Sequence, residues 1–302
     1  MFDPTISAVL RSNYTSRRFF LLYGLVLLAT LLALWMTYSS LPAGALLREV
    51  LVQVLGNFAA TVGIVICTYT FYLYVTPPGL RNANIIPLMS AEISDEIVNM
   101  SDDATDYWFL GRSGSYFRAK VLPKLEAAAL KDHRHISVRI VLPNFDAQTN
   151  RITYLKIKQS LGEPARETTL AANVVATIAA AVVASARNNY LTIRIGLSAT
   201  VPVLRHDISS KAALLTRDAK GLPAVLVNAG NPYFEMFRDV VENELAQSIE
   251  ITWDRQAAPF FNAGTVSLQD ILSAVHGLPP IDDTILAEAE PLLTAKPHRY
   301  GV

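Results

Sequence analysis

The chain has 302 residues, of which 51% are apolar and only 17% are charged, below the roughly 25% charge that is typical of soluble domains. Its 26 basic and 26 acidic side chains balance, which excludes the broad positive surface that strong direct binding to nucleic acid requires. The single cysteine, Cys67, excludes both an intramolecular disulfide and a thiolate zinc site built from this chain alone.

The first element in chain order is an uncharged, Leu-rich run at 19–38. About 20 such residues cross a ~30 Å hydrocarbon core as a helix, and Trp35 and Tyr38 suit the headgroup boundary at one end. A cleavable signal peptide is the alternative, with 17–18 as its basic segment and 43–45 as its cleavage site. The run is longer than the ~7–15 residues of a signal peptide's apolar region, so the pattern favours a transmembrane helix.

A second apolar segment at 50–75 follows and stops before the Thr-Pro-Pro-Gly sequence at 76–79, which cannot continue a helix. The two segments predict a helical hairpin. Basic residues flank its open end (Arg11, Arg17, Arg18 and Arg81), whereas its connecting loop has only Arg48 beside Glu49. The positive-inside rule then predicts a two-helix protein of the cell inner membrane with both termini in the cytoplasm.

One face of the second helix combines polar and small residues: Gln53, Gly56, Asn57, Ala60 and Gly63. Small residues four apart let helix backbones approach closely, and amides within a membrane segment mark functional contacts. This face either packs only on the first helix or joins copies of the chain into a homo-oligomer, with the amides lining a hydrated path.

From residue 79 on, helical and strand patterns alternate, which predicts an α/β domain with a mixed sheet flanked by helices. The later strands are too closely spaced for crossover helices and should be antiparallel. A long uncharged run at 168–186 is the one segment with two interpretations, a third membrane helix or a helix buried against the sheet; its Ala-rich composition favours the second. The predicted helices are 87–100, 116–130, 153–161, 168–186, 233–247, 268–275 and 281–293; the strands are 107–110, 136–142, 191–197, 201–204, 212–216 and 224–227; the loops and turns are 144–150, 207–210 and 218–221.

These patterns divide the chain into four parts. We expect a cytoplasmic N-terminal segment at 1–18 and two transmembrane helices within 19–78, at about 19–38 and 50–75. A cytoplasmic α/β domain at 79–250 and a helical C-terminal extension at 251–302 follow.

The loop at 111–115 lies between a predicted strand and a predicted helix and gathers groups that bind anions. Arg112, Ser113, Ser115 and Arg118 supply guanidinium and hydroxyl groups beside the backbone N–H groups of a helix start. The loop lacks the Gly-Lys-Ser/Thr ending of a P-loop. We therefore weigh a ligand site against an ordinary strand-to-helix turn.

The histidines suggest no complete catalytic or metal site. His206, Asp207 and Lys211 lie close in sequence and invite an acid/base hypothesis, but their spacing fits no known template and a turn with a solvated histidine is the simpler interpretation. His133 and His135 flank Arg134 at a predicted turn. We assign no catalytic residue, and expect no metal and no cofactor.

The segments at 107–114 (YWFLGRSG), 138–143 (VRIVLP) and 234–237 (FEMF) together resemble parts of a phospholipase-D-like half-domain, over roughly 87–250. The His-x-Lys motif that carries that family's chemistry is absent. The resemblance therefore implies a degenerate phospholipase-D-like fold and does not imply the activity.

Two membrane helices ahead of such a domain resemble the two-transmembrane effectors of bacterial anti-phage defence, of the retron-associated or cyclic-nucleotide-linked type. That resemblance implies an abortive-infection effector whose partners are the lipid bilayer, further copies of the chain, and a reverse transcriptase–nucleic acid complex or a partner that produces a nucleotide signal. Two alternatives stay open. One is a membrane-tethered nucleotide or phosphoester enzyme, with Arg112 and Ser113 holding phosphate and His206 as base, and the other is a non-catalytic membrane scaffold.

Overall fold

The computed structural model describes residues 13–42, 44–75, 85–217, 221–255 and 266–294. The chain divides into two compact units, 1–84 and 85–302, and each is described by itself. The helix-ending sequence at 76–79, Arg11 and Arg81 lie outside the described residues, as does part of the turn predicted at 218–221.

The first unit contains two long antiparallel helices, α2 (Asn13–Ser40) and α3 (Leu46–Val75), which confirms the predicted pair of apolar helices. Within them, Phe20–Ser40 and Leu46–Phe71 are long and apolar enough to cross a membrane. The helices contact each other through a few side chains, such as Tyr69 of α3, whose ring centroid lies 5.3 Å from that of Phe20. Most of their other apolar side chains are exposed, as expected of helices that a bilayer surrounds.

The second unit is built on a nine-stranded sheet with the order β1-β7-β6-β5-β2-β3-β4-β8-β9. The central strands β2, β3 and β4 are parallel and every other pair is antiparallel, which confirms the predicted mixed sheet. The strands are β1 (Ile85–Leu88), β2 (Asp106–Leu110), β3 (Ile136–Pro143), β4 (Leu191–Ser198), β5 (Arg205–Ser209), β6 (Ala212–Thr216), β7 (Ala224–Asn228), β8 (Ile249–Trp253) and β9 (Val275–His276).

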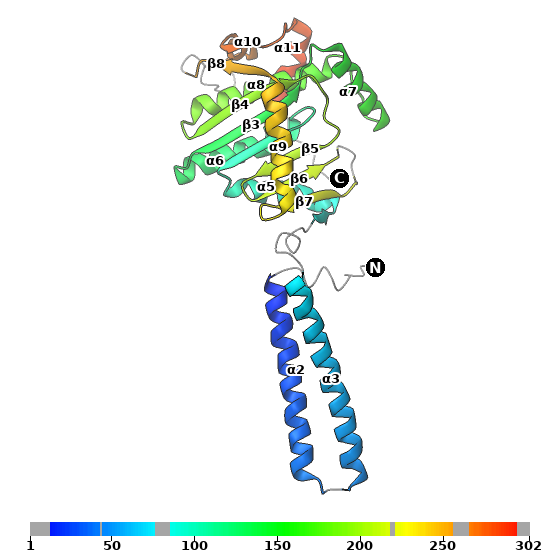
Figure 1. Cartoon of the computed structure of the whole chain (residues 1–302). Helices are drawn as coiled ribbons and strands as arrows, with labels where there is room; N and C mark the ends of the chain where they lie inside the picture. The colour runs from blue at the N-terminus through cyan, green and yellow to red at the C-terminus, as the bar shows by residue number, and fades with distance from the viewer. Residues whose placement is uncertain (1–12, 43, 76–84, 218–220, 256–265, 295–302) are drawn as a thin grey trace. The chain divides into compact units, whose positions relative to one another are not determined.

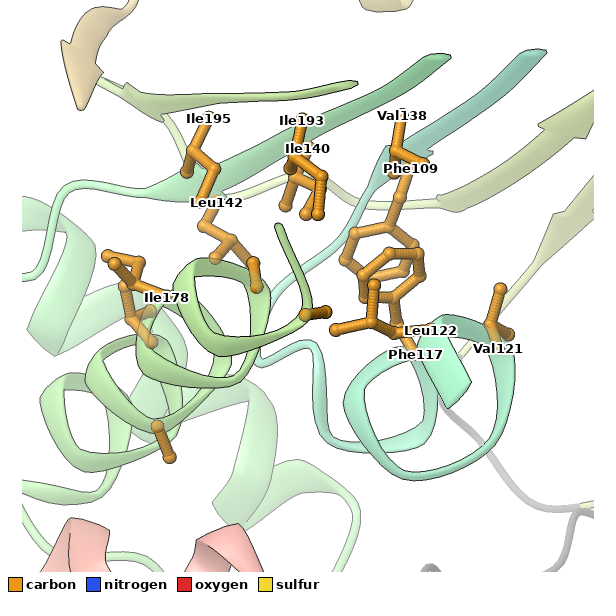
Figure 2. Close-up of a cluster of buried hydrophobic side chains, with 14 of the residues drawn as sticks. Phe109, Phe117, Val121, Leu122, Val138, Ile140, Leu142, Ile178, Ile193 and Ile195 are labelled. Atoms are coloured by element: carbon orange, nitrogen blue, oxygen red, sulfur yellow. The ribbon is translucent and has the colours of Figure 1, made fainter. Parts of the chain in front are cut away.

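One face of the sheet carries the main hydrophobic core, into which Phe109, Ile140 and Ile195 project from the strands and Phe117 and Ile178 from the helices (Figure 2). The 168–186 run forms α8, and 78% of the most apolar stretch of this helix is buried inside the unit. The prediction of a helix buried against the sheet is therefore confirmed. The elements on this side include α5 (Ser90–Asp102), the π-helix η1 (Phe117–Val121), α6 (Leu122–Asp132), α7 (Gln148–Ser160), α8 (Thr169–Arg187), α10 (Leu268–Ser273), α11 (Asp283–Ala289) and the 3-10 helix η2 (Glu290–Leu293).

The opposite face is crossed by α9 (Pro232–Gln247) (Figure 1). Asn231 caps this helix, because its side chain accepts the Tyr233 N–H, and Pro232 occupies the first turn, where its missing N–H is not needed. Phe234 and Val241 of α9 pack on Trp108 and other residues of a second, smaller apolar cluster.

Five sequence predictions are wrong in detail. Residues 85–88 form an edge strand and not a helix start, and Pro87 is tolerated there because an edge strand leaves one side of its backbone unpaired. Residues 201–204 are not a strand, because β5 begins only at Arg205, and β5 covers most of the turn predicted at 207–210. Helix α7 begins within the predicted loop 144–150, and β8 and β9 extend the sheet into the segment predicted to be helical.

Candidate functional site

The 111–115 loop is pressed against its surroundings, which explains its glycines. A Cβ on Gly111 would lie 2.4 Å from Cζ of Phe109, and one on Gly114 would lie 2.7 Å from Cγ2 of Thr177 in α8. Gly114 also has a φ of +68°, a backbone conformation that glycine adopts most readily. Both glycines are therefore required for close contact with the core.

Arg118 follows this loop within the π-helix η1 and is 6% exposed. Its Nη1 donates to the Asn173 carbonyl oxygen at 3.2 Å and to Oγ1 of Thr177 at 2.9 Å, while its Nε has no hydrogen-bond partner among the described residues. Burial lowers the pKa of Arg118 to about 10, so the guanidinium is still charged at neutral pH. In the described part of the chain this cation has only neutral acceptors.

Arg118 lines a pocket of about 200 Å³ between η1, α6, α8, α10 and η2. The other charged lining residues are Glu126 and Arg187, of which Glu126 is half-buried and Arg187 is exposed. Burial raises the pKa of the Glu126 carboxyl, against which the charge of Arg187 acts. The remaining wall is apolar and includes Leu122, Ala180, Ala184, Ile271 and Leu293.

The structure separates the four residues that the sequence grouped. Arg118 lines the pocket, whereas Arg112, Ser113 and Ser115 are not among its lining residues. The Ser113 carbonyl accepts a hydrogen bond from the Thr177 hydroxyl at 3.1 Å, so this part of the loop is fixed to α8. Sequence reasoning missed Glu126 and Arg187; the only signal for Arg187 was its position at the end of the long uncharged run.

His206, Asp207 and Lys211 do not converge. His206 and Asp207 are successive residues of β5 and so point to opposite faces of the sheet: the His206 ring lies 6.4 Å from that of Phe237 in α9, while Asp207 contacts Tyr107. Lys211 Nζ lies 2.7 Å from Asp103. The predicted turn with a solvated histidine is wrong, because His206 is 8% exposed within a strand.

Asp207 belongs to a buried ion pair in the main core. Its carboxylate lies 2.5 Å from Nε of Arg205 and accepts a hydrogen bond from the Tyr107 hydroxyl at 2.9 Å. The Arg205 guanidinium also lies over the rings of Phe109 and Tyr116, at 5.3 and 5.1 Å from their centroids. Burial, followed by the charge of Asp207, raises the pKa of Tyr107. These contacts join β5 to β2 and therefore stabilise the fold.

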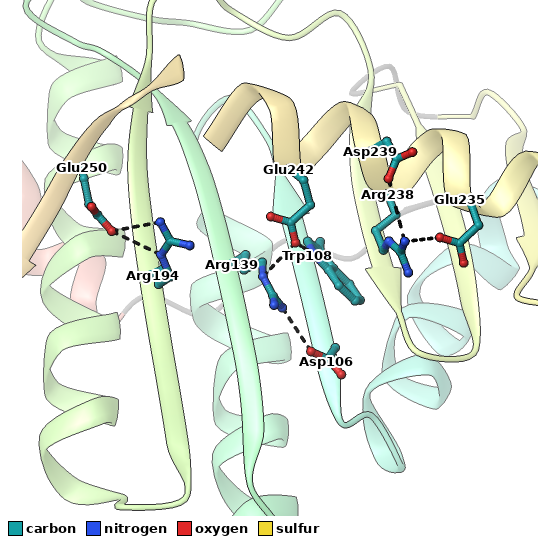
Figure 3. Close-up of polar contacts among 9 residues, drawn as sticks. All are labelled: Asp106, Trp108, Arg139, Arg194, Glu235, Arg238, Asp239, Glu242 and Glu250. Atoms are coloured by element: carbon teal, nitrogen blue, oxygen red, sulfur yellow. Dashed lines mark hydrogen bonds and ion pairs between the residues drawn. The ribbon is translucent and has the colours of Figure 1, made fainter. Parts of the chain in front are cut away.

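Arginines on the α9 face of the sheet also have acidic partners (Figure 3). Arg139 lies between Asp106, at 3.1 Å, and Glu242 of α9, at 2.9 Å. Glu242 also accepts a hydrogen bond from the Trp108 indole at 2.5 Å. Arg194 of β4 pairs in the same way with Glu250 of β8 at 3.2 Å. Arg118, in contrast, has no acidic partner among the described residues.

The residues of the predicted membrane face of α3 differ in their exposure. Gln53, Asn57 and Ala60 are exposed, whereas Gly56 and Gly63 are half-buried. A Cβ added at either glycine would meet nothing within 4 Å, so α2 makes no close backbone approach at them.

No three histidine, cysteine, aspartate or glutamate side chains of the described residues lie close enough to hold a metal ion. His133 and His135 lie near the Tyr190 ring, with centroids at 5.5 and 5.3 Å. No protein-family model, curated protein or solved structure matches the chain.

Proposed function

We propose that this protein is an inner-membrane effector whose α2–α3 hairpin self-associates and disrupts the bilayer under the control of its cytoplasmic α/β domain. The observation that carries the proposal is the exposure of the Gln53 and Asn57 side chains within the apolar span of α3. Both termini lie in the cytoplasm in this proposal.

Two amides in a hydrocarbon environment need hydrogen-bond partners, because lipid tails offer none. Gln53 and Asn57 are four residues apart, on one side of the helix, and no described residue of the hairpin accepts or donates a hydrogen bond to either side chain. The same face of a second copy supplies matching donors and acceptors. Gly56 and Gly63, with open space around them, allow a second helix to come close.

The described residues of the cytoplasmic unit form a pocket and do not bring together the groups that the enzyme alternative requires. His206 lies on the α9 face of the sheet and the Arg118 pocket on the other, so no observation favours the membrane-tethered enzyme. A degenerate phospholipase-D-like domain that senses a ligand or a partner, in the manner of two-transmembrane anti-phage effectors, fits this arrangement. A reverse transcriptase–nucleic acid complex or a producer of a nucleotide signal is the proposed source of the trigger.

Oxidative cross-linking in membranes tests self-association, because the single cysteine is a native reporter. Cys67 is exposed and lies 14 residues, close to four helical turns, after Gln53 on the same side of α3. We expect copper-phenanthroline to produce a disulfide-linked dimer of the full-length protein, and Gln53→Leu/Asn57→Leu to reduce that dimer at least fivefold. Thr70→Val is the matched control, since the Thr70 hydroxyl already bonds the Ile66 carbonyl.

Membrane potential tests the second half of the proposal. In cells that overproduce the full-length chain, we expect depolarisation that the double variant relieves and Thr70→Val does not. Growth arrest with an unchanged potential would contradict bilayer disruption, and a cross-linked dimer insensitive to the double variant would contradict the role of the two amides.

A further inference from the structure

We propose that the Arg118 pocket binds a small amphiphilic monoanion, an aliphatic or aromatic carboxylate whose charged end meets Arg118 and whose apolar body lies against α8 and α10. The inference rests on the proposed function only for its part in signalling. Binding itself is a separate property of the α/β domain.

The first argument is the unbalanced charge. A buried cation is stable in a protein when a counter-charge and hydrogen bonds satisfy it, and Arg205, Arg139 and Arg194 each have a carboxylate within 3.2 Å. Arg118 is as buried as Arg205 but has no acidic partner among the described residues, where its acceptors are the Asn173 carbonyl and the Thr177 hydroxyl. An anion in the pocket supplies the missing charge.

The second argument concerns the charge of the ligand. Arg118 and Arg187 contribute two positive charges to the lining and Glu126 one negative charge. One net positive charge matches a monoanion better than a phosphate dianion. The partly buried Glu126 carboxylate would repel a second negative charge, because interactions between charges strengthen away from bulk water.

The third argument concerns size and surface. An engineered apolar cavity of about 150 Å³ holds a benzene molecule, so a pocket of about 200 Å³ takes a ligand of roughly eight non-hydrogen atoms, in proportion to volume. Most of the wall is aliphatic, with Leu122 from α6, Ala180 from α8 and Ile271 from α10. Apolar surface of this kind favours a hydrocarbon body over a purely polar ion.

Calorimetry on the full-length protein in detergent micelles tests this site with matched probes. Benzoate and benzamide have nearly the same shape and differ in charge, and inorganic phosphate is an anion without an apolar body. We expect benzoate to bind at least tenfold more tightly than either of the other two. Equal binding of benzoate and benzamide, no binding of benzoate, or a preference for phosphate would each overturn the proposal.

Variants locate the binding. Arg118→Met should weaken benzoate binding at least tenfold, and Glu126→Gln should strengthen it severalfold because a repelling charge is lost. Ala180→Leu should block binding by filling the pocket while Arg118 stays intact, and so provides a test independent of the folding of Arg118→Met. Arg194→Met is the control, because Arg194 pairs with Glu250 outside the pocket.

The results separate this proposal from the proposed function. Benzoate binding that Arg118→Met and Ala180→Leu abolish, in a protein that never depolarises cells, supports the pocket and contradicts the effector. Depolarisation by a protein whose benzoate binding is the same in wild type, Arg118→Met and Ala180→Leu supports the effector and contradicts the pocket.

Discussion

Arg205 and Arg118 are two arginines on the same side of the sheet, each 6% exposed, in opposite electrostatic environments. Arg205 lies 2.5 Å from the carboxylate of Asp207, which also accepts the Tyr107 hydroxyl. Within the described residues, the Arg118 guanidinium donates only to the Asn173 carbonyl and the Thr177 hydroxyl, beside a pocket. The same side chain at the same depth therefore completes the fold in one place and leaves charge available to a ligand in the other.

The comparison separates burial from function. Burial penalises every ionised group, so burial alone does not distinguish a structural arginine from a binding one. The effect of a substitution on stability depends on whether the arginine has a charged partner. Replacing one member of a buried ion pair leaves the other as an uncompensated buried charge, whereas replacing an unpaired cation leaves no such charge. The same substitution at Arg205 and at Arg118 should consequently change stability in opposite directions.

The largest expected effect is that of Arg205→Met. The substitution keeps an apolar side chain near Phe109 and Tyr116. It leaves Asp207, at 0% exposure, with the Tyr107 hydroxyl as its remaining side-chain partner among the described residues. We expect a loss of about 3–5 kcal/mol in the free energy of unfolding, measured by urea denaturation of the full-length protein in micelles. A loss below about 1 kcal/mol would mean that the pair does not stabilise the core.

Gly114→Ala tests whether the loop before Arg118 is as tightly held as the contacts indicate. An alanine there has a φ of +68° and a Cβ 2.7 Å from Thr177, so we expect a loss of about 2 kcal/mol or more, of which backbone strain contributes about 1–2. Gly162→Ala is the matched control, because its φ is +69° and its Cβ would meet nothing within 4 Å. Equal losses from the two variants would show that the contact with Thr177 is unimportant.

Arg118→Met should stabilise the protein by about 1 kcal/mol, because it removes a buried charge that no described residue balances with a counter-charge. The Thr177 hydroxyl keeps the Asn173 and Ser113 carbonyls as acceptors, at 2.8 and 3.1 Å, so the substitution leaves no orphaned donor there. The same urea titration measures it. Destabilisation by more than 1 kcal/mol would remove the contrast with Arg205.

The surroundings of these two arginines also show which parts of the fold can be predicted from the sequence. Hydrophobic runs predict α2, α3 and α8, and alternation predicts β3 and β4, because each pattern reflects a local period. The sequence instead predicts a turn at 207–210 beside a solvated His206. Burial of this polar stretch is favourable only because Tyr107 and Phe109, distant in sequence, contact it. β8 and β9 are missed for the same reason, because their pairing with β4 and with each other joins distant parts of the chain.

The candidate site follows the same rule. The sequence predicts a role for Arg118 from its place after a glycine- and serine-containing loop, which is a local feature. The pocket also needs Arg187 of α8, Ile271 of α10 and Leu293 of η2, residues 69 to 175 positions farther along the chain. No sequence period connects them, so only the fold shows that they share one cavity.

The smallest expected effect concerns His206, a buried titratable group on the other face of the sheet. Burial lowers the pKa of His206 in the folded protein, so between that lowered value and the ordinary value of 6.5 the unfolded chain binds more protons than the folded one. Stability should therefore fall as the pH drops through this window, with a slope of at most about 1.4 kcal/mol per pH unit from this residue. His206→Leu should lose that contribution while Arg118→Met keeps it, because Arg118 stays charged throughout the same range. Identical pH dependence of unfolding in wild type and His206→Leu, measured from pH 7.5 to 5, would contradict a neutral buried histidine at the α9 contact.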